Sequence, residues 1–101
     1  MTNPEELLGA AHAGCFSMAL SLGLGKAGFA PQRINTTATV HLDTENLRIS
    51  AIDLDTNARI PGITEQAFLE QAELARNNCI VSQALKAQRL GFRPGLPKTA
   101  R

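Results

Sequence analysis

Aromatic residues are almost absent from this sequence: its 101 residues include no Trp, no Tyr and only four Phe. Proteins that bind single-stranded nucleic acids stack the bases on aromatic side chains. We therefore expect no nucleic-acid binding of this kind. The apolar fraction of 44% is ordinary for a folded protein, so we expect one small globular domain rather than a disordered chain.

Cysteine is also scarce, with Cys15 and Cys79 as the two residues of this type. The sequence has no CxxC motif and no Cys/His cluster at metal-ligand spacing, so zinc binding is not indicated. The spacing alone fits two buried core residues, a structural disulfide or a redox pair. Small secreted domains usually carry more cysteines than this.

The longest run without a charged residue covers residues 7–25, which is long enough to raise the question of a membrane span. Ala, Gly and Ser dominate the run, however, and His12 lies inside it. Glu5 and Glu6 stand where a signal peptide would have positive charges. We therefore expect neither a membrane segment nor a signal peptide, and we predict a cytoplasmic protein.

Basic residues are concentrated at the C-terminal end. Residues 86–101 include five basic and no acidic residues, whereas residues 1–85 include nine acidic and five basic ones. Prolines and glycines interrupt the last segment, and it shows no periodicity. We expect a solvated irregular tail; contact with nucleic acid or with an acidic membrane is the alternative.

The first predicted element is a long helix. Asn3 can cap it, Pro4 suits its first turn, and Glu5 and Glu6 complement the positive end of the helix dipole. The helix is expected to run to about Lys26. It is apolar nearly all round, which is typical of a buried central helix.

A hairpin is predicted to follow the helix. Residues 34–42 alternate apolar and polar side chains, which indicates a half-buried strand. Residues 43–46 favour a turn, and residues 47–60 form the second strand. The apolar positions change parity within this second strand, which predicts a bulge near residues 51–53.

A second helix is predicted at residues 65–77, with Thr64 as its cap. Apolar residues recur at helical spacing along it. If the helical phase continues, Cys79 lies on its buried face. Helix, hairpin and helix in this order predict an α+β fold. The residues that share the buried face are Phe68, Ala72, Ala75 and Cys79.

Two segments of the chain carry specific motifs. Residues 3–18, NPEELLGAAHAGCFSM, resemble the long first motif of the OsmC branch of the OsmC/Ohr family. Residues 75–85, ARNNCIVSQAL, are similar to the helix that ends in CPVSxAL. The hairpin and helix between the motifs also match the family's order, so the resemblance covers residues 3–85.

The resemblance implies a thiol peroxidase that reduces organic hydroperoxides. Cys15 matches the peroxidatic cysteine, whose thiolate attacks the hydroperoxide, releases an alcohol and becomes a sulfenic acid. Cys79 matches the resolving cysteine, which then forms a disulfide with it. Glu5 matches an acidic residue that orients the family's activating arginine. The expected reductant is a dithiol, such as a lipoylated protein, and no metal or flavin cofactor is required.

The separation of Glu5 and Cys15 bears on the quaternary structure. Ten residues span about 15 Å along a helix, so the two side chains cannot meet within one helix. If both serve one site, Glu5 reaches Cys15 of a second protomer. This predicts an intertwined, two-fold homodimer. The alternative is that Glu5 simply complements the helix dipole.

The sequence departs from the family pattern at three points. Family members have further strands before the first helix, which carry the activating arginine, and a final strand after the second cysteine. Ile80 replaces the proline that usually follows the resolving cysteine. We therefore expect a partial OsmC-like domain at residues 1–85 and a basic irregular tail at residues 86–101. The alternative functions are a catalytically impaired dimerisation scaffold and a binder of acyl chains.

Overall fold

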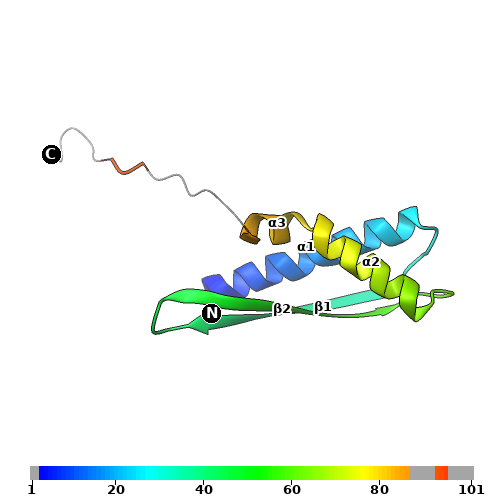
Figure 1. Cartoon of the computed structure of the whole chain (residues 1–101), viewed down its shortest axis with the longest axis horizontal. Helices are drawn as coiled ribbons and strands as arrows, with labels where there is room; N and C mark the ends of the chain where they lie inside the picture. The colour runs from blue at the N-terminus through cyan, green and yellow to red at the C-terminus, as the bar shows by residue number, and fades with distance from the viewer. Residues whose placement is uncertain (1–2, 87–92, 96–101) are drawn as a thin grey trace.

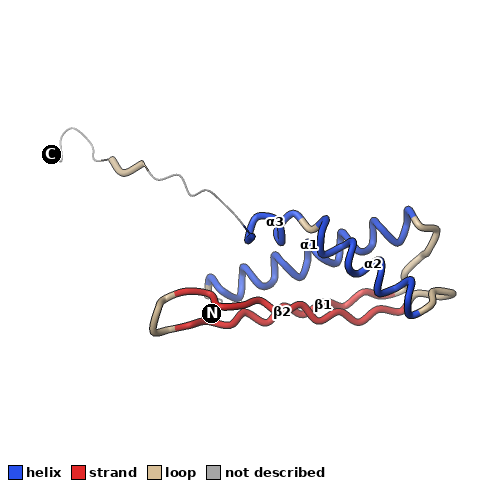
Figure 2. The backbone as a smooth tube through the Cα atoms, viewed as in Figure 1, coloured by secondary structure: helices blue, strands red, loops and turns tan. Residues whose placement is uncertain are grey.

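The computed structural model describes residues 3–86 and 93–95 and contains three helices and one hairpin in that part of the chain (Figure 1). The helices lie on one side of the two-stranded sheet (Figure 2): α1 packs against β1, and α2 and α3 pack against α1. The predicted α+β fold is confirmed. Apart from residues 86 and 93–95, the predicted tail lies outside the described residues. The elements are α1 (Pro4–Lys26), β1 (Arg33–Asp43), β2 (Arg48–Arg59), α2 (Glu65–Asn78) and α3 (Ile80–Lys86).

Helix α1 begins and ends where the sequence predicts. The Asn3 side chain accepts a hydrogen bond from the backbone N–H of Glu6 at 2.8 Å, and Pro4 occupies the first turn. Lys26 lies in the last turn, where its charge complements the negative end of the helix dipole. The cap thus satisfies a backbone donor that the helix itself cannot pair.

Burial of α1 is confined to one stripe, which corrects the expectation of a helix buried all round. The opposite face of the helix is open in the single chain, where Met18 is 74% exposed and Leu22 is 62% exposed. The hairpin and α2 cover only part of the surface of a helix of this length. The buried stripe consists of Gly9, His12, Phe16, Leu20 and Leu24.

The same helix is the segment of the described chain that is long and apolar enough to cross a membrane. Length and hydropathy alone do not distinguish a membrane span from a core helix, because core helices pass the same test. Here Phe16, Leu20 and Leu24 form a core with Ile60 and Ala75. One stripe of the helix therefore packs into the core of the domain.

The hairpin contains the predicted bulge, but one residue earlier than expected. His41 pairs with Ala51 and Leu42 pairs with Ile49, so Ser50 is the extra residue. From Ile52 onward, every second side chain of β2 faces inward without interruption. The extra residue that shifts the inward-facing positions must therefore come before Ile52. The predicted turn is also confirmed at residues 44–47.

Helix α2 starts at the predicted cap, where the Thr64 hydroxyl accepts a hydrogen bond from the N–H of Ala67 at 3.1 Å. It ends at Asn78, close to the predicted end, but the helical phase does not continue through Cys79. The backbone of Cys79 is extended, with φ −69° and ψ 118°, and the chain turns into the separate helix α3. The expectation that Cys79 is buried is confirmed, because none of its surface is exposed.

Candidate active site

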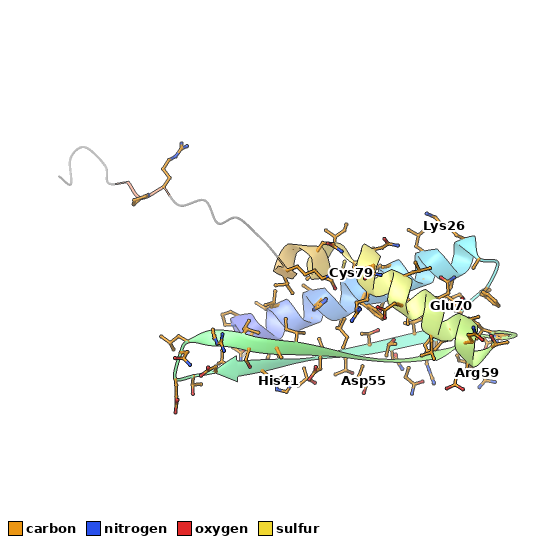
Figure 3. All side chains as sticks on the ribbon, viewed as in Figure 1. Lys26, His41, Asp55, Arg59, Glu70 and Cys79 are labelled. Carbon is orange, nitrogen blue, oxygen red and sulfur yellow. The ribbon has the colours of Figure 1, made fainter. Side chains whose placement is uncertain are left out.

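The two cysteines lie together, although 64 residues separate them in the sequence. Cys15 lies in the middle of α1 and is partly buried, and it packs against the core cluster that contains Cys79. Figure 3 shows Cys79 where α2 meets α3, alongside α1. Both thiols are free, and the Cys15 thiol contributes to lowering the pKa of the Cys79 thiol. The fold therefore places the two sulfur atoms where they could react with each other.

Cys79 is surrounded by groups that favour its thiolate. Burial acts to raise the pKa of the Cys79 thiol, because desolvation disfavours the charged form. Hydrogen bonds from the hydroxyl and the backbone N–H of Ser82 oppose this effect, with further contributions from the Cys15 thiol and the N–H of Val81. Together they bring the pKa of Cys79 below its ordinary value of 9.0. A thiolate is the nucleophilic form of cysteine.

Ser82 also contacts a buried histidine. The Nε2 atom of His12 lies 2.7 Å from the Oγ atom of Ser82. The two side chains are 6% and 8% exposed. Burial lowers the pKa of His12. His12 is therefore a packed residue on the buried stripe of α1. Ser82 was not among the predicted site residues, although its position three residues after Cys79 on one helical turn is a signal that could have found it.

Cys15 lines an open cavity of about 890 Å³ between α1 and α2. Most of the cavity wall is apolar, with Met18, Leu22 and Leu74 among the lining side chains. Lys26 brings a positive charge to its edge. A cavity of this size and character can hold a small apolar molecule next to the Cys15 thiol.

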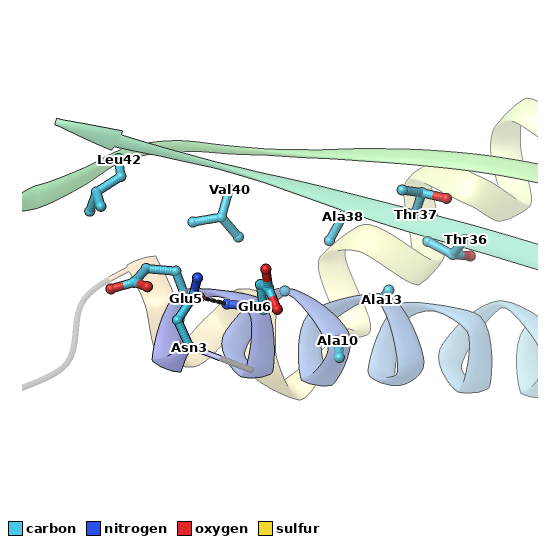
Figure 4. A pocket seen from close by; sticks show the side chains of 11 residues that line it. Asn3, Glu5, Glu6, Ala10, Ala13, Thr36, Thr37, Ala38, Val40 and Leu42 are labelled. Carbon is cyan, nitrogen blue, oxygen red and sulfur yellow. Dashed lines mark hydrogen bonds between the residues drawn. The ribbon is translucent and has the colours of Figure 1, made fainter. Parts of the chain in front are cut away.

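Glu5 does not share this cavity. It lines a separate cavity of about 530 Å³ between the first turns of α1 and strand β1, with Thr36, Val40 and Leu42 opposite it (Figure 4). The single chain therefore does not bring Glu5 to Cys15, as the helical spacing predicts. Among residues 3–86 and 93–95, no arginine lines the cavity at Cys15.

The remaining polar groups form no metal site. Within the described segments, no three side chains of His, Cys, Asp or Glu are grouped so that they could hold a metal ion. His41 and Asp53 pair at 2.8 Å on the exposed face of the hairpin. His41 points away from the helices and is exposed (Figure 3).

Comparison with known proteins identifies the family. A sequence model of the family described as OsmC-like proteins matches residues 1–90. The chain belongs to the OsmC family. The resemblance of the two cysteine segments to this family is thereby confirmed, since the match includes both of them.

Among relatives of known name, this OsmC-family chain is 53% identical over 89 residues to the peroxiredoxin OsmC of Escherichia coli. The alignment covers 86% of this chain and 62% of that protein. The peroxiredoxin OsmC of Shigella flexneri matches with the same identity. The chain thus spans about three fifths of the length of the relatives it matches.

Solved structures of OsmC-family proteins share the fold. The organic hydroperoxide resistance protein of Elizabethkingia anophelis superposes with a TM-score of 0.68 at 30% identity, over 84% of this chain and 61% of that one. OhrB of Bacillus subtilis superposes with a TM-score of 0.62 at 22% identity, over 84% and 63%. The second match concerns the fold alone.

Proposed function

We propose that this chain carries the catalytic cysteines of a thiol-dependent peroxidase that reduces organic hydroperoxides to alcohols. The observation that carries the proposal is the pairing of Cys15, at the wall of an apolar cavity, with the buried Cys79. The names of two relatives support it. The Escherichia coli protein is a peroxiredoxin, and the Elizabethkingia anophelis protein confers organic hydroperoxide resistance.

The proposed reaction has three steps. The Cys15 thiolate attacks the outer oxygen of the hydroperoxide; the O–O bond breaks, and the alkoxide takes a proton and leaves as the alcohol. The Cys79 thiolate then attacks the sulfur of the Cys15 sulfenic acid, whose oxygen leaves as water while the disulfide forms. A dithiol finally exchanges with this disulfide, so that both protein thiols return and the dithiol is oxidised.

The shape of the cavity supports a substrate class. Its apolar wall favours fatty-acyl or aryl hydroperoxides over hydrogen peroxide, because only an apolar substituent gains from leaving water. We propose a dithiol reductant, such as the lipoyl group of a protein. We also propose a cytoplasmic location, where thiols are kept reduced.

The site is proposed to be completed in a homodimer. The open face of α1, defined by Met18 and Leu22, is apolar and borders the cavity at Cys15. Two such faces packed antiparallel would cover each other. If the two α1 helices instead cross near Ala10, midway between Glu5 and Cys15, Glu5 of one chain lies beside Cys15 of its partner. Glu5 would then act as a positioning residue for a cation beside the thiolate.

Single-turnover oxidation tests the proposed function. The reduced chain is mixed with cumene hydroperoxide, and the thiol count and intact mass are followed. We expect rapid loss of two thiols and formation of a Cys15–Cys79 disulfide, with Cys15→Ser abolishing the fast phase. Oxidation no faster than that of a free thiol such as glutathione would overturn the proposal and leave a scaffold.

The volume of the cavity favours one other function, the binding of acyl chains. About 890 Å³ with apolar walls is within the range of small-molecule pockets. Native mass spectrometry of the purified chain with added fatty acid distinguishes the two. Stable binding of an acyl chain, together with slow oxidation of Cys15, would favour a carrier over a peroxidase.

A further inference from the structure

Three buried side chains outline a polar path through the core. His12 Nε2 lies 2.7 Å from Ser82 Oγ. Ser82 follows the buried Cys79 by three residues, and its hydroxyl helps to lower the pKa of the Cys79 thiol. The path joins α1 to α3 and ends at a sulfur atom with no exposed surface. A thiol in this position cannot give its proton directly to bulk water.

We propose that His12 and Ser82 form a proton relay for Cys79, in which the Ser82 hydroxyl carries the thiol proton to the Nε2 atom of His12. The inference rests on the proposed function, since it concerns the step in which Cys79 closes the disulfide. His12 and Ser82 are positioning residues in this scheme, because neither touches the hydroperoxide.

The hydrogen bonds reverse their direction as the proton moves. Before transfer, the Cys79 S–H donates to Ser82 Oγ, and the Ser82 O–H donates to the unprotonated Nε2 of His12. After transfer, His12 Nε2–H donates to Ser82 Oγ, and the Ser82 O–H donates to the Cys79 thiolate. One proton leaves sulfur and one arrives at the imidazole, so the serine is unchanged.

The environment of His12 suits the receiving end of this relay. Burial lowers the pKa of His12 and so favours the neutral ring, whose Nε2 can accept a proton; the imidazolium is disfavoured there and must pass its proton on at once. The other ring nitrogen, Nδ1, is buried and has no hydrogen-bond partner among the described residues. Histidines with a purely structural role usually have both nitrogens paired, because an unpaired buried polar atom is costly.

The accepted proton has a route to solvent. His12 and Ser82 line a third cavity, of about 660 Å³, between the helices and strand β2. Three charged residues line this cavity: Asp53 on β2, Arg76 on α2 and Lys86 on α3. The imidazolium can release its proton there, while the sulfenic oxygen leaves Cys15 at the separate cavity between α1 and α2 and takes a proton from solvent.

Titration of Cys79 alone tests the relay without any peroxide. In a Cys15→Ser background, the ultraviolet absorbance of the thiolate is followed against pH. We expect Ser82→Ala and His12→Phe each to raise the apparent pKa of Cys79 by about 1 to 2 pH units, because a hydrogen bond to a charged group is lost or weakened. Ser82→Thr keeps the hydroxyl and is expected to restore the value.

A matched control removes a different hydroxyl, that of Ser17 on α1, the helix that carries His12. The Ser17 hydroxyl donates to Thr36 at 2.7 Å, so Ser17→Ala removes a partly buried hydrogen bond without touching the relay. We expect it to leave the Cys79 titration unchanged. Equal titration curves for Ser82→Ala, Ser82→Thr and Ser17→Ala, in chains that melt cooperatively, would overturn the relay.

The second readout uses the chain with both cysteines. At pH 7, His12→Phe and Ser82→Ala should slow disulfide formation about tenfold or more, while the consumption of hydroperoxide by Cys15 stays within about twofold. Equal slowing of both steps would contradict a role confined to Cys79. If the unmodified chain does not consume hydroperoxide at all, the peroxidase proposal fails, but the titration still decides whether the relay exists.

Discussion

Gly9 on α1 lies directly against Val40 on β1: a Cβ atom added at Gly9 would come within 3.1 Å of the Cγ2 atom of Val40. The close approach lets the helix rest on the strand. We predict that Gly9→Val lowers the free energy of unfolding by about 1–3 kcal/mol, because the larger side chain overpacks the contact. Gly25→Val is the control, since a Cβ atom there meets nothing within 4 Å. Equal unfolding midpoints in urea for both variants would contradict the tight contact.

Leu47 ends the hairpin turn in the left-handed region, with φ 52°, and its side chain is 86% exposed. This conformation costs an ordinary residue about 1 kcal/mol and costs glycine almost nothing. We predict that Leu47→Gly raises the melting temperature by a few degrees. Thr44 lies in the same turn with an ordinary φ, so Thr44→Gly should lower it. A loss of stability in both variants would show that the strain at Leu47 is negligible.

The elements that local signals define could be predicted from the sequence. Asn3 and Thr64 cap the helices as expected, because an N-cap depends on a side chain and a backbone donor only three residues away. The hairpin register follows from alternation, and the odd spacing of Ile49 and Ile52 requires one extra residue between them. Periodicity alone could not choose which intervening residue bulges.

The parts that depend on distant contacts could not be predicted in the same way. The helical phase continues without a break through Cys79, yet the backbone leaves the helix there. Ser82 meets His12 across 70 residues, so no local pattern connects them. The open face of α1 was predicted to be buried because its residues are apolar. An apolar sequence shows that a face prefers to be buried, but it does not show whether the same chain or a second molecule buries it.

Acidification is predicted to destabilise the fold through His12. Burial lowers the pKa of His12 below its ordinary value of 6.5, so the unfolded chain binds more protons than the folded chain below that pH. The free energy of unfolding should therefore be level above about pH 6.5 and fall as the pH drops toward about pH 5. Urea titrations at several pH values measure this slope.

His12→Gln should remove most of this pH dependence, because the group that takes up the proton on unfolding is gone. His41→Gln is the matched control, since His41 is exposed on the hairpin. It should keep the slope of the unmodified chain. Hydrogen bonds from Asn46 lower the pKa of Asp43, so Asp43 loses its charge only at more acidic pH. The pH range in which His12 affects stability lies above that range. An unchanged slope in His12→Gln would assign the effect to another group.

The open face of α1 is predicted to mediate self-association. Met18→Glu combined with Leu22→Glu places two carboxylates on this apolar face, and burying unpaired charges in an interface is strongly unfavourable. We expect sedimentation to shift from a dimer to a monomer. Leu47→Glu adds one carboxylate at the exposed hairpin turn, away from this face, and should leave the dimer intact. Monomeric sedimentation of the unmodified chain would refute the proposed dimer.

The proposed order of steps at the two thiols predicts that the Cys79→Ser variant accumulates the sulfenic acid of Cys15. Without a second thiol, the sulfenic acid formed on Cys15 has no partner within the chain, so it should persist long enough for dimedone to trap it. The partly buried position of Cys15 beside an open cavity leaves room for this small reagent. Intact mass after one equivalent of cumene hydroperoxide should show one dimedone adduct, located on the peptide that contains Cys15.

The reverse variant gives the matched control for this experiment. In Cys15→Ser the remaining thiol has no exposed surface, so the hydroperoxide cannot reach Cys79 and no adduct should form. Trapping on Cys79 instead of Cys15 would exchange the roles of the two cysteines. The rate of adduct formation in Cys79→Ser can be compared with the rate of thiol loss in the unmodified chain. Equal rates would show that attack on the hydroperoxide precedes and limits closure of the disulfide.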